Sequence, residues 1–258
     1  RASSVAAKYE SAPREHDFAV VVGVEDYADL PRADFAERDA AAVVTHMEAL
    51  GVPRRNIIHL AGRRAVYSAL KKYVESWLPR NATPESRVYF YFSGHGAPDP
   101  KTSEAYLMPW DGDASFLADT AYPVKKLYKQ LAALPAGEIV VALDACFSGS
   151  GGRSVLAKGA RPLVTKVDFG GQPDGKLTLL TAASSDEITS TLQEESHGTF
   201  TYFLLRGLNG AAAEPSGRIT SAGLFAHLKP RVQDEARRQN RDQTPTYTSS
   251  RDLVLRGN

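Results

Sequence analysis

Cysteine is almost absent from this 258-residue chain, which contains a single residue of that type, Cys146. A lone cysteine cannot form a disulfide within the chain and cannot build a cysteine-rich zinc site, so disulfide scaffolds and zinc fingers are excluded. Two states remain for Cys146: a small buried hydrophobic residue, as most free cysteines are, or a reactive thiol.

The chain also lacks an excess of charge and a long apolar run. Lys and Arg total 31 against 30 Asp and Glu, so the formal net charge is +1 and we expect no nucleic-acid partner. No apolar run approaches the roughly 20 residues that cross a bilayer, so we expect no membrane span. The sequence begins with Arg1 rather than Met, so we interpret it as a processed piece and leave its compartment open, cytoplasmic or exported.

Short, β-branched apolar segments alternate with segments of helical periodicity along most of the chain. Strands that are buried on both faces of a parallel sheet have this composition, and helices serve as the crossovers between them. We therefore predict an α/β fold, a three-layer sandwich in which helices cover both faces of a mostly parallel six-stranded sheet. The predicted strands are residues 17–23, 56–60, 87–92, 138–143, 176–181 and 251–255, and the predicted helices are residues 34–50, 64–78, 123–134, 199–208 and 221–238.

No internal repeat, low-complexity block or linker divides the chain. We therefore predict a single domain over residues 1–258, with an N-terminal extension over residues 1–16. Residues 149–175 are rich in glycine and contain two prolines, so we predict a long mobile loop there. His197 precedes the predicted helix 199–208, and we interpret it as part of the helix start, with Ser196 or Thr199 as the cap.

His95 and Cys146 each follow a predicted strand directly. A cysteine becomes a nucleophile when a base helps to form its thiolate, and histidine is the usual base. Cys146 lies 51 positions after His95, a spacing that accommodates one crossover helix and one strand, so both loops should emerge at the same edge of the sheet. We predict a catalytic pair, with the backbone N–H groups of Gly96 and Cys146 as an oxyanion hole.

Residues 91–96 read Tyr-Phe-Ser-Gly-His-Gly, and residues 141–149 read Val-Ala-Leu-Asp-Ala-Cys-Phe-Ser-Gly. These two segments resemble the His and Cys boxes of caspase-like cysteine peptidases (family C14), specifically of the metacaspases and their bacterial relatives, the orthocaspases. A histidine about 50 residues before the cysteine is a known caspase feature. The resemblance spans roughly residues 17–255 and implies a caspase-like fold and a cysteine endopeptidase that acts through an acyl-enzyme.

The residue two positions before the nucleophile is Asp144, where animal caspases, which bind a substrate aspartate, have glutamine. An anionic residue there selects a cation. The resemblance to metacaspases implies that Asp39, Ser93 and Asp144 bind the guanidinium or ammonium group of the substrate. We therefore predict peptide or protein substrates with Arg or Lys before the cleaved bond, and the resemblance implies a monomer.

Calcium is the one cofactor that the resemblance raises, because many metacaspases are activated by it. Calcium needs a cluster of oxygen ligands, some of which Asp111, Asp113 and Asp119 could supply. However, Arg153 lies about where a further acidic ligand is expected. We therefore predict no metal ligand and no cofactor, and calcium dependence is not assumed.

Two other functions stay open. A catalytically silent caspase-like domain would serve as an interaction or regulatory module, although such relatives usually lack one of the two catalytic residues. A different hydrolase on the same α/β plan would use Asp144 or Ser148. The loop after the nucleophile suggests self-cleavage, by the same or a neighbouring molecule, beside the plainer interpretation of a solvated basic loop; its basic residues are Arg153, Lys158, Arg161 and Lys166.

Overall fold

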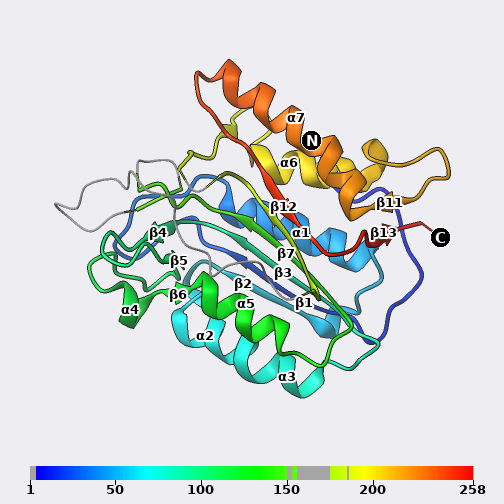
Figure 1. Cartoon of the computed structure of the whole chain (residues 1–258), viewed down its shortest axis with the longest axis horizontal. Helices are drawn as coiled ribbons and strands as arrows, with labels where there is room; N and C mark the ends of the chain where they lie inside the picture. The colour runs from blue at the N-terminus through cyan, green and yellow to red at the C-terminus, as the bar shows by residue number, and fades with distance from the viewer. Residues whose placement is uncertain (1–3, 150–152, 156–174, 185, 258) are drawn as a thin grey trace.

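The computed structural model describes residues 4–149, 153–155, 175–184 and 186–257. Its centre is a six-stranded sheet with the order β12-β8-β7-β3-β1-β2 (Figure 1). Five neighbouring strands run parallel, and β12 is antiparallel to β8. The six strands are β1 (Phe18–Gly23), β2 (Ile57–Ala61), β3 (Arg87–Ser93), β7 (Glu138–Asp144), β8 (Leu177–Thr181) and β12 (Thr246–Thr248).

Helices cover both faces of this sheet, so the predicted three-layer α/β sandwich is confirmed (Figure 1). One face carries α1 (Ala36–Ala49), α6 (Thr199–Arg206) and α7 (Ser221–Arg238), and the other carries α2 (Tyr67–Lys72), α3 (Leu78–Asn81) and α5 (Val124–Ala132). The remaining elements are α4 (Leu117–Thr120) and the short strands β4 (Gly96–Pro98), β5 (Ala105–Leu107), β6 (Tyr122–Pro123), β9 (Thr191–Leu192), β10 (His197–Gly198), β11 (Ile219–Thr220) and β13 (Val254–Arg256).

Alternation along the strands decides which side chains meet which helices. In β3, Phe90 and Phe92 belong to the core under α2 and α5, whereas Tyr89 and Tyr91 belong to the core under α1, α6 and α7. Because successive side chains of a strand point to opposite faces, Ser93 at the end of β3 points toward α1 and α6. The same alternation in β7 directs Asp144 to that face.

The prediction for the sixth strand was wrong. Residues 251–255 do not join the sheet edge; β13 pairs instead with β11, at the start of α7. Leu253 and Leu255 are buried in the core beneath α7, and Asp252 accepts a hydrogen bond from the backbone N–H of Ala222 in the first turn of that helix. The sixth strand of the sheet is β12, at the edge. It is short and half-buried, so its sequence contains no apolar run that would predict a strand.

Two helix details also differ from the predictions. The predicted helix 64–78 is divided into α2, a π-helical turn over Tyr73–Trp77, and α3, which continues through Asn81. The predicted cap of α6 is wrong, because Gly198 occupies the N-cap position and no side chain caps the helix. In place of capping, Thr199 accepts a hydrogen bond from the hydroxyl of Ser190.

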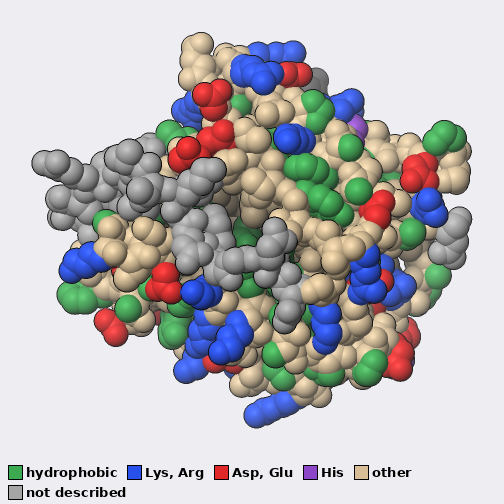
Figure 2. Space-filling view, viewed as in Figure 1, with side chains coloured by type: hydrophobic (Ala, Val, Ile, Leu, Met, Phe, Trp, Pro, Cys, Tyr) green, Lys and Arg blue, Asp and Glu red, His purple; other side chains and the backbone are tan. Residues whose placement is uncertain are grey.

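The surface agrees with the balanced composition. Acidic and basic side chains are interspersed on the face shown in Figure 2. Among the described residues, no helix is both long and apolar enough to span a membrane. Part of the predicted N-terminal extension packs on α1, where the His46 ring donates to the carbonyl of the buried Val5 over 2.7 Å. Most of the loop predicted over residues 149–175 lies outside the described residues.

Candidate active site

The parallel pairing of β3 and β7 positions the two predicted catalytic loops. Ser93 and Asp144 are register partners at the ends of these strands, and His95 and Cys146 each follow two residues later. The loops are in direct contact, since a Cβ atom on Gly96 would lie 2.3 Å from the carbonyl oxygen of Cys146. Only glycine, which has no Cβ atom, allows the two loops to approach so closely. This explains why the residue after His95 is glycine.

His95 is buried and held in one orientation. Its backbone N–H donates to the Tyr27 hydroxyl over 2.7 Å, and its Nε2 lies 2.6 Å from the carbonyl oxygen of Pro31. A carbonyl can only accept, so Nε2 carries the proton and Nδ1 carries the lone pair in the neutral ring. Nδ1 is buried and has no hydrogen-bond partner within the described residues. Burial lowers the pKa of His95 below its usual value, against the opposing effect of the Pro31 carbonyl.

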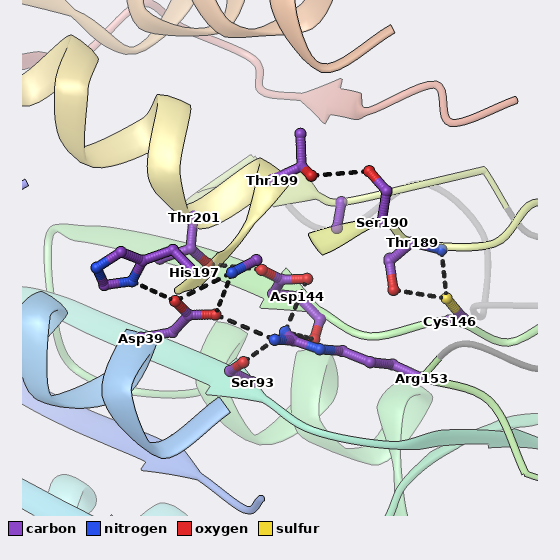
Figure 3. Close-up of polar contacts among 12 residues, drawn as sticks. Asp39, Ser93, Asp144, Cys146, Arg153, Thr189, Ser190, His197, Thr199 and Thr201 are labelled. Atoms are coloured by element: carbon purple, nitrogen blue, oxygen red, sulfur yellow. Dashed lines mark hydrogen bonds and ion pairs between the residues drawn. The ribbon is translucent and has the colours of Figure 1, made fainter. Parts of the chain in front are cut away.

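Cys146 is 1% exposed, and its sulfur is bound by Thr189, a residue not predicted from the sequence. The thiol donates to the Thr189 hydroxyl over 3.0 Å and accepts from the Thr189 backbone N–H over 2.7 Å (Figure 3). Burial raises the pKa of the thiol, and the hydrogen bonds with the side chain and the backbone of Thr189 lower it in part. The sulfur of Cys146 is thus held by Thr189 on two sides.

The two backbone N–H groups predicted for the oxyanion hole converge on one oxygen atom. Gly96 donates to the carbonyl oxygen of Arg153 over 2.8 Å, and Cys146 donates to the same oxygen over 3.2 Å. A carbonyl bound in this way lies beside the thiol and is polarised by two donors. The oxygen atom in the predicted oxyanion hole thus belongs to the chain itself, to a residue seven positions after Cys146.

The predicted substrate-binding residues converge on the side chain of this same Arg153. Its Nη1 donates to the Ser93 hydroxyl over 2.6 Å and lies 3.0 Å from Asp144 Oδ1, and its Nη2 lies 3.1 Å from Asp39 Oδ2 (Figure 3). The backbone carbonyl of Asp34 accepts a further bond from Nη2 over 2.8 Å. The arginine side chain is 4% exposed. We call the site formed by Asp39, Ser93 and Asp144, which the guanidinium of Arg153 occupies, the cation pocket.

Charge holds the guanidinium in the cation pocket. Burial alone would lower the pKa of Arg153, but the negative charges of Asp144 and Asp39 raise it above its usual value. For Asp39 burial is the largest effect and raises the pKa, against the hydrogen bond from His197 and the charge of Arg153. Two buried carboxylates so close together need a cation between them, because unpaired buried charges are costly.

Three further residues orient the two carboxylates, and none of them was predicted from the sequence to belong to the site. His197 Nδ1 lies 2.7 Å from Asp39 Oδ1, the Gly198 N–H donates to Asp39 Oδ2 over 3.0 Å, and Thr201 donates to Asp144 Oδ2 over 2.6 Å. A Cβ atom on Gly198 would lie 2.7 Å from Asp144 Oδ2, so a side chain cannot fit there. These residues lie far from both sequence boxes; residues 198–205 resemble the family only weakly, and that resemblance implied no role in the site for Gly198 or Thr201.

The described residues do not fit an activating calcium ion. They include no group of three or more His, Cys, Asp or Glu side chains able to hold a metal. Asp111 accepts from the backbone N–H of Tyr67, and Asp113 from that of Ser115, so both act in local turns. Arg153, which stands near an expected ligand position in the sequence, lies in the cation pocket.

Comparisons with known proteins agree with the fold. The family model described as the caspase domain matches residues 16–254. A protein of Geobacter sulfurreducens has a similar solved structure, with 15% identity, a TM-score of 0.62 and coverage of 92% of this chain and 94% of its own. Caspase-1 of Spodoptera frugiperda has 14% identity, a TM-score of 0.62 and coverage of 96% of this chain and 93% of its own. No curated protein sequence matches.

Proposed function

The chain belongs to the caspase-domain family of cysteine peptidases, and from that premise we propose that it is an endopeptidase that cleaves after Arg or Lys. One observation carries the proposal. An arginine side chain lies between Asp39 and Asp144 while the carbonyl group of the same residue accepts hydrogen bonds from the N–H groups of Gly96 and Cys146. A substrate must present a basic side chain and its scissile carbonyl in this same relation.

The chemistry assigns a separate task to each group. Cys146 Sγ attacks the carbonyl carbon while His95 Nδ1, the ring nitrogen that carries the lone pair, takes the thiol proton. The Gly96 and Cys146 N–H groups stabilise the negative charge that develops on the oxygen. His95 then gives the proton to the leaving amine, and water hydrolyses the resulting thioester with His95 again as base. The thiol must first leave Thr189, a rotation of one side chain.

The charges of the cation pocket support basic over acidic specificity. A substrate aspartate would meet two buried carboxylates, a like-charge contact that costs several kcal/mol. Arginine fills the cation pocket with a planar group that reaches both acids and Ser93, whereas the single ammonium of lysine forms fewer bonds at once. We therefore expect arginine to be preferred to lysine. The partners we propose are peptides or proteins, bound by a monomer of one domain.

Fluorogenic peptides with Arg, Lys, Gln or Asp before the reporter test this proposal, with and without a calcium chelator. The matched variants are Cys146→Ala and His95→Ala, each of which should abolish hydrolysis after arginine. Because Arg153 occupies the cation pocket, the assay should include Arg153→Ala, in which the pocket is free. If neither the original chain nor Arg153→Ala hydrolyses any peptide, and iodoacetamide does not label Cys146, the silent-module alternative replaces the enzyme.

A further inference from the structure

Gly96 binds the chain on both sides of the peptide bond that follows Arg153. Its N–H donates to the Arg153 carbonyl over 2.8 Å, and its own carbonyl accepts from the Val155 N–H over 3.0 Å. These two bonds form a parallel bridge between Gly96 and Ser154. Because the guanidinium of Arg153 lies in the cation pocket, Ser154 and Val155 stand where the first and second residues after a cleaved bond would lie.

The bridge lies on the outer edge of a small sheet. β4 pairs with β5, and β5 pairs with β6, so one edge of β4 has no neighbour within this three-stranded sheet. Among the described residues, Ser154 alone bridges to that edge. An extended peptide that adds to a sheet edge gains main-chain hydrogen bonds whatever its sequence, and pockets for its side chains give specificity. The edge of β4 can therefore bind the residues that follow the scissile bond of a substrate.

The side chain of Val155 packs into an apolar cluster beside this edge. Val155 is 7% exposed, and the cluster is separate from the two cores of the main sheet; its other buried members are Ala97, Tyr106, Met108, Leu117 and Ala121. Ala97 follows Gly96 as Val155 follows Ser154, so these two side chains lie on the same face of the bridge. A charged side chain in this place would lose its water without gaining a partner, which is costly.

We propose that the edge of β4 and this apolar cluster form a binding site for the second residue after the cleaved bond, and that the site selects a small apolar side chain such as valine. This inference rests on the proposed function, because the basic residue of the substrate must lie in the cation pocket at the same time. Gly96 then binds the substrate on both sides of the cut, through its N–H before the cut and through its carbonyl after it. In the resting chain residues 153–155 occupy these positions, and a substrate replaces them.

The first position after the cut differs from the second. The Ser154 hydroxyl accepts a hydrogen bond from the backbone N–H of Gly149 over 2.7 Å, so the side chain at the first position meets a polar backbone group. Val155 meets apolar side chains and is bound by its backbone through Gly96. The described residues therefore assign selection of an apolar side chain to the second position.

Internally quenched peptides test the proposal with the Arg153→Ala variant. The peptides share Arg before the cut and Ser after it, and they differ only in the second residue after the cut, which is Val, Ala, Asp or N-methyl-valine. Every peptide displaces the same segment of the chain, so the ratios of kcat/KM report on the peptide alone. We expect Val to exceed Ala by roughly tenfold and Asp by more, because the charge of Asp would be buried. N-methyl-valine keeps the side chain but cannot donate to Gly96, so it should fall roughly fivefold below Val.

A change in the pocket should change the preference. Leu117→Ala, made in the Arg153→Ala variant, enlarges the apolar cluster and should shift the ratio of kcat/KM from Val toward Leu peptides by roughly fivefold. The matched control is Leu192→Ala on β9, which packs against the core under α6 and α7 and should leave this ratio unchanged. Reporter peptides that end directly after Arg have no second residue, so their hydrolysis shows whether Leu117→Ala is folded. If it is not, the peptide series remains decisive, because it needs no change in the cluster.

Binding and hydrolysis together separate this inference from the proposed function. Fluorescence anisotropy of the labelled peptides with the Cys146→Ala, Arg153→Ala double variant measures binding without cleavage. Hydrolysis after Arg at equal kcat/KM for the Val and Asp peptides overturns the site and leaves the peptidase intact. Binding that favours Val, with no hydrolysis by the Arg153→Ala variant, overturns the peptidase and leaves the site. Absence of both the preference and the hydrolysis overturns both proposals.

Discussion

Ser93 and Asp144 of the cation pocket lie two residues before His95 and Cys146, the predicted catalytic pair, yet the cation pocket and this pair are in opposite states. In the cation pocket, Asp39 and Asp144 are both paired with the guanidinium of Arg153. In the catalytic pair, His95 Nδ1 has no hydrogen-bond partner within the described residues, and the Cys146 thiol is bound by Thr189. Under the proposed function, the basic side chain is bound before His95 and Cys146 are paired.

This difference follows from the free energy that it costs to bury each group without a partner. Two buried carboxylates without a cation are costly, so Arg153 pairs with both of them in the resting chain. A neutral thiol and a neutral imidazole are far less costly to bury, so they need not be paired with each other. Catalytic hydrogen bonds are often formed only in the reacting complex. The resting chain therefore fixes what the site binds and leaves the proton transfer for later.

Removing one charge from the cation pocket should have the largest effect. Asp144→Asn keeps the shape and an acceptor for Thr201 but leaves a single carboxylate for the substrate. In the Arg153→Ala background, where no internal arginine competes, we expect kcat/KM for arginine peptides to fall by roughly a hundredfold, about 3 kcal/mol. Steady-state rates on Arg and Gln peptides measure it, and an equal loss on both would show that Asp144 maintains the fold rather than the specificity.

A smaller loss is expected from His197, which touches Asp39 and no part of the reacting bond. His197→Ala removes a hydrogen bond to a charged group, worth about 1.5–3 kcal/mol, and should raise KM for arginine peptides by roughly ten- to a hundredfold with little change in kcat. His197→Asn can return a donor near the position of Nδ1 and should recover part of the loss. A fall in kcat with KM unchanged would instead place His197 in the chemical step.

The predicted catalytic pair can be tested through Thr189, which binds the sulfur of Cys146. Thr189→Val keeps the backbone donor to the sulfur and removes the hydroxyl, whose hydrogen bond lowers the pKa of Cys146. We expect the midpoint of the pH dependence of iodoacetamide labelling to move to higher pH, with a roughly fivefold slower reaction at neutral pH, about 1 kcal/mol. Thr189→Ser, which keeps a hydroxyl, is the control. A midpoint that moves to lower pH would contradict the assigned role.

The sequence predicted the parts of the site that depend on strand periodicity. His95, Cys146, Ser93 and Asp144 follow directly from the ends of two buried strands, and their convergence needs only the parallel register between β3 and β7. The sheet and its covering helices follow from the same apolar segments. These features are local or depend on one crossover, so a single sequence contains enough information to predict them.

The remaining parts depend on long-range contacts that leave no periodic signal. Thr189 and Thr201 are ordinary threonines in the sequence, and they reach the site because β8 and α6 return to the same edge of the sheet. The position of Arg153 is harder still to predict from the sequence, since a basic residue in a glycine-rich loop is expected to be exposed to solvent. Its burial results from two carboxylates that require a cation, and that requirement becomes visible only once both acids are placed in space.

The smallest expected effect is a shift in pH dependence, and it tests the state of His95 directly. Burial lowers the pKa of the imidazole below 6.5, so the neutral ring that accepts the thiol proton persists to lower pH than for an exposed histidine. Protonation removes the base, so kcat/KM should fall as the pH drops through a midpoint below 6.5. The measurement is kcat/KM of the Arg153→Ala variant on an arginine peptide, followed as the pH is lowered. A midpoint above 6.5 would mean that His95 gains a stabilising partner when the thiol leaves Thr189, and that the catalytic pair is charged before substrate binds.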